Sequence, residues 1–259
     1  MASTRREKEL ARMRAERQAA RRAEEAAKRK RRSAIIASAL AVLLVAGAVA
    51  FIGVRSRDNG SQVVAGGTAP TTPAASGPCT YDPAGEPSKP VEPPPATPTA
   101  TGPVKVTSTT NRGVVVWDLL TEEAPCTSNS IISLASQGFY DDTPCHRLTT
   151  SGIFVLQCGD PTGEGTGGPG YQFAEENLEG ATYPRGTVAM AKSSAPGSTG
   201  SQFFLVYKDT ELPPEYTPVG KITKGLDVLD EIADAGSEPK GDGKPKLETT
   251  IETFTTDAT

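Results

Sequence analysis

Histidine is nearly missing from this chain of 259 residues, because only His146 is present. The four cysteines include no C-x-x-C pair, and protein zinc sites are usually built from such pairs together with histidines. A Ser-His-Asp hydrolase would have His146 as its only base, and the charge of the adjacent Arg147 would weaken that base. The chain also has no nucleophile elbow of the G-x-S-x-G type. We therefore expect no metal, no cofactor and no hydrolase of this kind.

The two signs of charge are unevenly distributed along the chain, although the formal net charge is only −4. Residues 1–32 carry 13 Lys/Arg against 5 Asp/Glu, whereas the remainder carries 14 against 26. Residues 33–54 have no charged side chain, and a helix of that length, at about 1.5 Å per residue, crosses a hydrocarbon core of about 30 Å. A basic flank before the span and an acidic body after it predict a single-pass cell-membrane protein with a cytoplasmic N-terminus.

Other interpretations of these first segments stay open. The apolar run could be a buried core helix, or the core of a cleaved signal peptide, since Ala48-Val49-Ala50 has the small-x-small form that signal peptidase accepts. No cysteine follows the run directly, which excludes a lipoprotein. We interpret residues 1–32 as a solvated cytoplasmic segment drawn to anionic lipid headgroups, and we expect no nucleic-acid partner.

Residues 55–102 are rich in Pro, Thr, Ala, Gly and Ser and have hardly any apolar pattern, which predicts a disordered linker. The triplet Cys79-Thr80-Tyr81 interrupts this composition and suggests local docking onto the domain that follows.

All four cysteines follow the apolar run, where disulfides persist if this part is extracytoplasmic. Four cysteines allow three pairings, and the sequence does not choose among them. We favour Cys145 with Cys158, which bracket a hairpin, and Cys79 with Cys126. Side chains alternate between the two faces of a strand, and this alternation argues against the pair of Cys145 with Cys158 unless a β-bulge intervenes.

Residues 103–259 are long enough for one compact domain. Strands are expected over 104–108 and 113–119, around Arg147, Val155, Val188, Phe204 and Val219, and over 248–254, with helices over 127–137 and 226–235. Trp117 is expected in the core. Many short strands with two helices predict a mainly β fold, a closed antiparallel barrel capped by the helices.

Three blocks of this domain carry a specific pattern. They are Cys145-His146-Arg147, then Ile153-Phe154-Val155-Leu156-Gln157-Cys158-Gly159-Asp160, and finally Gly200-Ser201-Gln202-Phe203-Phe204-Leu205. Between them, Gly163-x-Gly165-x-x-Gly168 matches a dinucleotide pattern, but Pro169-Gly170 follows instead of a helix, so we interpret it as a loop. In order and spacing, the blocks closely resemble the cyclophilin family of peptidyl-prolyl cis-trans isomerases.

The resemblance implies an eight-stranded cyclophilin-like barrel and an enzyme that isomerises the bond before proline in polypeptide substrates. It assigns a catalytic role to Arg147, as donor to the prolyl nitrogen, and to Gln157, which binds a substrate carbonyl and orients the arginine. It assigns substrate binding to His146, Phe154, Val155, Met190, Ala191, Lys192, Gln202, Phe204, Leu212 and Tyr216. Among these, the backbone of Ala191 and Lys192 pairs with the residues that precede proline.

The chain also departs from the family pattern. The hairpin between Arg147 and Phe154 is two residues longer than usual, and one residue is added between Lys192 and Gly200. Val155 replaces a common methionine and Tyr216 a common histidine. Glu211 stands where many members carry a tryptophan, which predicts weak cyclosporin binding.

We expect a membrane-anchored prolyl isomerase, with a monomeric catalytic domain outside the membrane, that accelerates the folding of exported proteins. The sequence leaves two other functions open. One is a proline-peptide-binding module or holdase with little turnover, and the other is an envelope scaffold.

Overall fold

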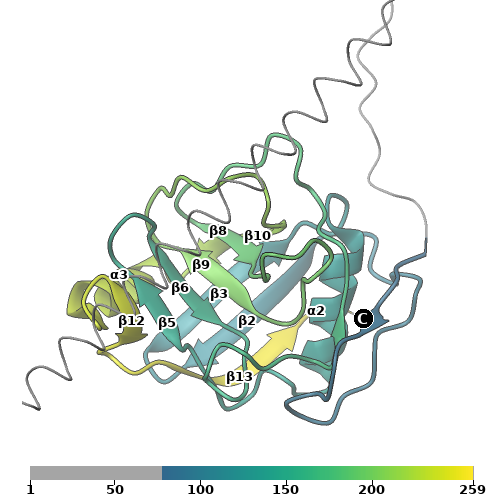
Figure 1. Ribbon diagram of the computed structural model, residues 1–259, viewed down its shortest axis with the longest axis horizontal. Helices are drawn as coiled ribbons and strands as arrows, with labels where there is room; N and C mark the ends of the chain where they lie inside the picture. The colour runs from purple at the N-terminus through teal and green to yellow at the C-terminus, as the bar shows by residue number, and fades with distance from the viewer. Residues whose placement is uncertain (1–77, 259) are drawn as a thin grey trace, which may run out of the picture. The chain divides into compact units, whose positions relative to one another are not determined.

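The computed structural model describes residues 78–258, and Figure 1 shows how their elements are arranged. The expected cytoplasmic segment (1–32), membrane span (33–54) and first half of the linker (55–77) lie outside the described residues. No helix within 78–258 has the length and apolar character needed to cross a membrane.

The described residues form thirteen short strands and two helices. The helices are α2 (Pro125–Ser136) and α3 (Leu226–Ala235). The strands are β1 (Asp82–Pro83), β2 (Val104–Thr110), β3 (Gly113–Leu119), β4 (Thr143–Pro144), β5 (Arg147–Thr149), β6 (Val155–Cys158), β7 (Tyr171–Gln172), β8 (Thr187–Met190), β9 (Phe203–Val206), β10 (Pro218–Lys224), β11 (Ser237–Glu238), β12 (Asp242–Pro245) and β13 (Thr250–Thr256). Every strand and helix expected from the pattern is confirmed to within a few residues.

The main sheet is antiparallel, in the order β11-β12-β5-β6-β9-β8-β10-β3-β2-β13-β4. This corrects the expected closed eight-stranded barrel, because the hydrogen-bonded order has two ends. The sheet curls until its two sides meet at one stretch of the chain. In this stretch β4 pairs with β13, while β5, three residues further on, pairs with β6. At the interruption, the N–H of Cys145 donates to Thr249 and that of His146 to Gln157. If β4 and β5 are taken as one interrupted strand, eight strands follow one another around the curl, with β11 and β12 added beside β5.

An aromatic cluster fills the inside of the curled sheet. Trp117 is only 1% exposed, as expected for a core residue, and its ring lies 5.4 Å from Phe254 and 5.7 Å from Phe203, measured between centroids. Tyr140 adds a fourth ring, which is 4.4 Å from Phe254. Rings of this size remove large apolar areas from water, so the cluster is a main source of the domain's stability.

The helices lie at opposite ends of the domain in Figure 1, with α3 beside β5 and β12 and α2 beside residues 78–102. The first turn of α2 has no cap from its own chain neighbours. Instead, the Glu176 carboxylate accepts hydrogen bonds from the backbone N–H groups of Cys126 and Thr127, 3.1 and 2.7 Å away. A carboxylate at this position satisfies unpaired N–H groups and favours the positive end of the helix dipole.

The segment of residues 78–102, which we call the N-terminal segment, is held along the domain, which corrects the expected disordered linker for this half. The docking expected at Cys79-Thr80-Tyr81 is confirmed by a disulfide between Cys79 and Cys126, and by the Tyr81 hydroxyl, which donates to the Cys126 carbonyl at 2.8 Å. Further along, Asn129 donates to the Pro95 carbonyl at 2.8 Å. These bonds fasten the segment along α2 (Figure 1).

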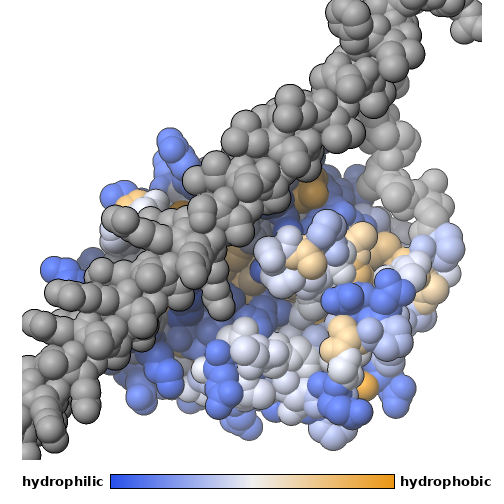
Figure 2. Space-filling model, in the orientation of Figure 1, coloured by the Kyte–Doolittle hydropathy of each residue, from blue (hydrophilic) through white to orange (hydrophobic). Residues whose placement is uncertain are grey.

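The second disulfide joins Cys145 to Cys158, so both favoured pairings are present. The alternation that opposed this pair does not apply, because Cys145 lies in the interruption before β5 begins. The face of the domain in Figure 2 is mostly hydrophilic, with apolar residues in small separate groups, in keeping with the excess of acidic residues after residue 32.

Candidate active site

A small cavity of about 150 Å³ lies on the outer face of the sheet, beside Arg147. We call it the small cavity. Its apolar walls come from β6, β9 and the loops that precede β6 and β10. Its lining consists of Arg147, Ile153, Val155, Gln157, Ala191, Lys192, Phe204, Leu212 and Tyr216.

Strand register explains why these side chains share one face. Gln157 lies opposite Phe204 in the pairing of β6 with β9, and opposite Arg147 in the pairing of β5 with β6. Side chains alternate along a strand, so Val155 joins Gln157 on the outer face while Leu156 and Cys158 point into the main core. The sequence pattern thus brings one cation, one amide and an apolar floor together across three neighbouring strands.

The Arg147 guanidinium is held from two sides. Its Nε and Nη2 donate to the two carboxylate oxygens of Asp242, both at 2.8 Å, and its Nη1 donates to Oε1 of Gln157 at 3.2 Å. A guanidinium has more N–H donors than these three bonds use, so donors remain for a ligand. The hydrogen bonds with Asp242 raise the pKa of Arg147 and lower the pKa of the Asp242 carboxyl. Arg147 is therefore a permanent cation in a fixed orientation.

Two amides continue this network. Nε2 of Gln157 donates to Oε1 of Gln202 at 2.8 Å, and Nε2 of Gln202 donates to the Gly167 carbonyl at 3.0 Å. Because an amide oxygen accepts and its nitrogen donates, each bond fixes the orientation of the next side chain. The network thus runs from Asp242 through Arg147 and Gln157 to the glycine-rich loop.

The buried carboxylate of Asp160 organises that loop. Asp160 accepts hydrogen bonds from the hydroxyl and N–H of Thr162 and from the N–H groups of Gly165 and Gly167, at 2.7 to 3.0 Å. Burial raises the pKa of this carboxyl, but the bonds from Thr162, Gly167 and Gly165 together outweigh burial, so that the pKa is lowered. The glycine pattern is a loop, as expected, and an ionised Asp160 fixes the Gly167 carbonyl that receives Gln202.

The small cavity contains eight of the twelve residues expected at the site. Gln202 reaches it only through Gln157 and lines a larger neighbouring cavity. Met190 lies in the main core, because it pairs with the inward-facing Phe203 while Ala189 pairs with Phe204. Alternation along β8 therefore moves Met190 away from the outer face.

Phe154 and His146 also lie outside the small cavity. The ring of Phe154 packs against Tyr207, with 6.1 Å between centroids, and Lys208 lies 4.5 Å above it. His146 lines a separate cavity of about 270 Å³ on the side of β4. Burial lowers the pKa of His146, Asp160 opposes this, and Arg147 reinforces it, so the imidazole is neutral at pH 7.

Sequence reasoning missed two residues of the site. Ile153, in the lengthened hairpin, lines the small cavity, whereas the neighbouring Phe154 does not. Asp242 lies 95 residues after its partner Arg147, and no local motif marks it. Only the pairing of β12 with β5, in which Asp242 stands opposite Thr149, brings the carboxylate to the arginine.

Comparison with known proteins identifies the family. Residues 104–256, more than half of the chain, match the family model for cyclophilin type peptidyl-prolyl cis-trans isomerases. A Mycobacterium tuberculosis protein named probable peptidyl-prolyl cis-trans isomerase B is 49% identical over 191 residues, which cover 67% of this chain and 62% of that protein. Its namesake from Mycobacterium leprae is 49% identical over 197 residues, covering 69% and 66%. The chain thus spans somewhat less than two thirds of the length of these relatives.

Solved structures agree with this match. A Cryptosporidium parvum cyclophilin type isomerase has a TM-score of 0.55 and 29% identity, covering 61% of this chain and 99% of that structure. The same protein in the presence of the dipeptide Ala-Pro has a TM-score of 0.54 and 30% identity, covering 60% and 99%. Sequence family and fold agree, and the chain belongs to the cyclophilin type peptidyl-prolyl cis-trans isomerase family.

Proposed function

We propose that this chain catalyses cis–trans isomerisation of peptide bonds that precede proline in polypeptides. The observation that carries the proposal is the Arg147 guanidinium, held by Asp242 and by Gln157, beside a cavity with an apolar floor. The related Cryptosporidium structure was determined in the presence of Ala-Pro, which supports a proline-containing ligand.

The chemistry needs no nucleophile. Rotation about the peptide bond faces a barrier of about 18–20 kcal/mol, because resonance gives the C–N bond partial double-bond character. Twisting the bond localises a lone pair on the prolyl nitrogen, and a hydrogen bond from Arg147 to that lone pair stabilises the twisted state more than either planar state. Lowering the barrier by about 6 kcal/mol would give roughly a thousand turnovers per second.

The other residues of the small cavity hold the substrate in the geometry for this step. Phe204, Leu212 and Val155 supply an apolar surface for the prolyl ring. The Nε2 of Gln157 carries a second N–H besides the one given to Gln202, and this N–H would bind a substrate carbonyl. Confining the ring while the adjoining carbonyl turns favours the twisted bond over both planar forms.

The test is an isomerisation assay on a Xaa-Pro peptide with the full-length chain, its Arg147→Ala variant and, as a matched control, Arg112→Ala. Arg112 is an exposed arginine in the turn between β2 and β3. We expect Arg147→Ala to lower kcat/KM by about 100- to 1,000-fold, as loss of a transition-state donor does, and Arg112→Ala to leave it unchanged. Equal turnover by the wild type and Arg147→Ala would refute the proposed mechanism.

A binding module or holdase is the second candidate, and the lengthened hairpin at Ile153 favours it, since this hairpin reshapes a wall of the cavity. A binding module predicts that proline peptides bind to the wild type without any acceleration of cis–trans exchange. A scaffold in which the domain is only a spacer predicts neither binding nor turnover.

We further propose that the enzyme acts on exported proteins at the outer face of the cell membrane, anchored by residues 33–54. Support comes from the uncharged run, the basic residues before it and the acidic residues after it. Two disulfides in the domain also suit an oxidising compartment. Intact cells treated with a protease provide the test. Degradation of the domain with protection of residues 1–32 is expected, and a domain that stays intact until lysis would contradict this location.

A further inference from the structure

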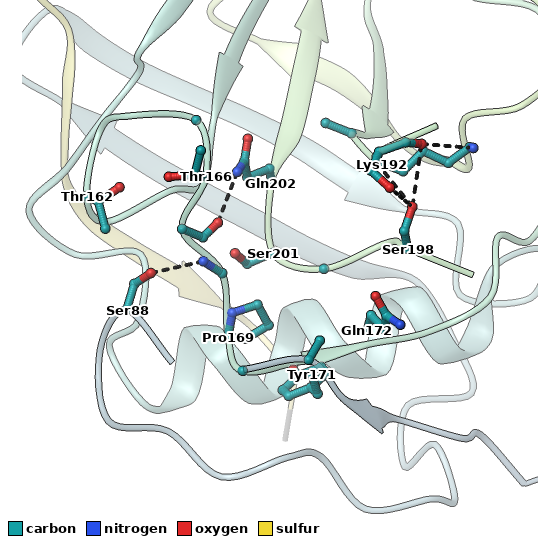
Figure 3. Close-up of a pocket in the computed structure, with 18 of the residues that line it drawn as sticks. Ser88, Thr162, Thr166, Pro169, Tyr171, Gln172, Lys192, Ser198, Ser201 and Gln202 are labelled. Atoms are coloured by element: carbon teal, nitrogen blue, oxygen red, sulfur yellow. Dashed lines mark hydrogen bonds between the residues drawn. The ribbon is translucent and has the colours of Figure 1, made fainter. Parts of the chain in front are cut away.

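A second, larger cavity of about 640 Å³ adjoins the small one. We call it the large cavity, and Figure 3 shows its lining. The two cavities share Gln157, Ala191 and Lys192, so they are parts of one continuous groove. A peptide spans about 3.3 Å per residue when extended. A chain with its proline in the small cavity therefore places a neighbouring residue in the large one.

One wall of the large cavity comes from outside the family match. Ala84, Glu86 and Ser88 line it, and all three precede residue 104, where the match begins. The pairing of β1 with β7 sets Asp82 opposite Gln172 and begins this wall.

Hydrogen bonds continue the wall along the glycine-rich loop. The Ala84 N–H donates to the Gly170 carbonyl, and the Ser88 N–H donates to the Gly168 carbonyl, both at 2.8 Å. The Ser88 hydroxyl in turn accepts from the Gly168 N–H at 2.9 Å, the bond drawn beside Ser88 in Figure 3.

Close packing shows that the segment belongs to the groove. A Cβ atom on Gly167 would lie 2.0 Å from Oδ1 of Asp160 and 2.5 Å from the Ser88 hydroxyl. A Cβ on Gly170 would lie 3.0 Å from Pro87. The loop that receives Gln202 through the Gly167 carbonyl therefore fits directly against the N-terminal segment. The disulfide of Cys79 with Cys126 fixes the start of that segment.

Two charged residues, Glu86 and Lys192, line the large cavity. Glu86 is exposed and takes part in no ion pair within the described residues. Lys192, the other charged residue of the lining, directs its ammonium group to the Ser193 carbonyl at 3.3 Å. The remaining polar lining consists of neutral hydroxyls and amides. Glu86 is thus the one carboxylate of the lining, and it makes no ion pair within the described residues, so it can bind an incoming cationic side chain.

We infer that the N-terminal segment completes the substrate groove and that Glu86 selects lysine or arginine over glutamate near the proline of the substrate. This inference rests on the proposed function. The resemblance that pairs the backbone of Ala191 and Lys192 with residues before proline places the selected residue on the N-terminal side of the proline.

The experiment uses the full-length chain and two peptide series, with Lys, Gln or Glu at the first or the second position before proline. Exchange is followed by NMR, so that no coupling protease adds a preference, and affinities are measured by NMR titration of the same peptides. At one of these two positions, we expect kcat/KM and affinity to be about fivefold higher for Lys than for Glu, which corresponds to the free energy of an exposed ion pair. This ratio should become smaller at high salt.

Charge reversal by Glu86→Lys should invert that ratio, and Glu86→Gln should bring it close to one. The matched control is Glu92→Lys, on the same segment but bonded through its backbone N–H to Gln137 of the domain, away from the groove. It should keep the wild-type ratio.

A wild-type ratio near one in both series, or a ratio that Glu86→Lys leaves unchanged, would overturn the inference. The outcome is separable from that of the proposed function. Turnover that depends on Arg147 but shows no charge preference refutes only the inference, whereas a charge preference in affinity without turnover supports it and refutes the enzyme.

Discussion

The small and large cavities differ in how they are built. The small cavity is lined by strands of the curled sheet and its loops, and its polar residues are locked by directional bonds from Asp242 to Gln157. The large cavity takes one wall from a segment with little regular structure, which a disulfide and a few backbone hydrogen bonds hold in place. The small cavity, in which we propose that the prolyl peptide bond twists, is thus the more rigidly built of the two. The large cavity, in which we propose that a neighbouring substrate side chain is selected, has the less rigid wall.

This contrast has a general physical reason. A hydrogen bond to a twisting peptide nitrogen loses most of its value when the donor is misplaced by about 1 Å, so the donor must stand on rigid elements. Recognition of a flexible charged side chain tolerates more movement, because the interaction between exposed charges falls off gradually with distance. A segment added before the family domain therefore suits selectivity better than catalysis.

We expect the largest effects from removing each disulfide in turn, which distinguishes the role of the small cavity from that of the large cavity. The Cys79–Cys126 bond closes a 47-residue separation, and by loop entropy Cys79→Ser with Cys126→Ser should destabilise the domain by about 4 kcal/mol. Thermal unfolding measures this loss. Below the new transition, turnover should persist while the lysine preference disappears.

The matched control is Cys145→Ser with Cys158→Ser, which opens a 13-residue separation and should cost about 3 kcal/mol. Here turnover should fall for every peptide, because Cys158 adjoins Gln157 and Cys145 is two residues from Arg147. If both double variants changed selectivity and turnover alike, the proposed division between the cavities would be wrong.

A smaller effect is expected from Asp242→Asn, which removes a charge but keeps a polar side chain beside Arg147. We expect kcat to fall by about tenfold, which is about 1.4 kcal/mol, with little change in KM, because a loosened arginine weakens transition-state more than ground-state binding. Kinetics on one peptide measure this. An unchanged kcat, or a rise in KM alone, would show that Asp242 does not position Arg147 for the reaction.

The pH dependence of wild-type kcat provides a second test of the pair formed by Asp242 and Arg147. Hydrogen bonding to Arg147 lowers the pKa of Asp242 and raises the pKa of Arg147 itself. A depressed carboxyl pKa means that the pair's contribution is complete above the unfolded-state value, near 3.9, and is lost only as pH falls through the lower folded value. Wild-type kcat should therefore show no step from this pair between about pH 5 and pH 8.

The smallest effect on turnover is expected at the outer rim of the small cavity. Glu211 is exposed and does not line that cavity, whereas many family members carry a tryptophan at the aligned position. Glu211→Trp should strengthen cyclosporin binding by about tenfold, or about 1.4 kcal/mol, through added apolar contact, and change kcat/KM for peptides by less than about twofold. Calorimetry with the wild type and the variant measures this. Tight stoichiometric inhibition of the wild type would contradict the expectation.

The local pattern was enough to place most of the fold. Alternating apolar residues gave β2, β3 and β13, and a flanking proline and glycine gave α2, because these signals depend only on neighbours in the chain. The two-residue strands β1, β4, β7 and β11 were not expected, since so short a pairing leaves no periodic signal, and β12 was not expected either. The order of the main sheet, with its two ends, likewise depends on contacts between distant segments.

The sequence by itself determined the family and singled out Arg147 and Gln157, which the structure brings into contact, because these residues lie in contiguous blocks whose order is characteristic. Only the tertiary structure decided that Met190 and Phe154 face away from the small cavity, and that Ile153 and Asp242 belong to the site. It also turned the Pro-rich residues 78–102 from an expected linker into a wall of the groove. The physical reason is common to all of these: strand register, side-chain facing and long-range pairing are set by the packing of the whole domain, which no local window of sequence contains.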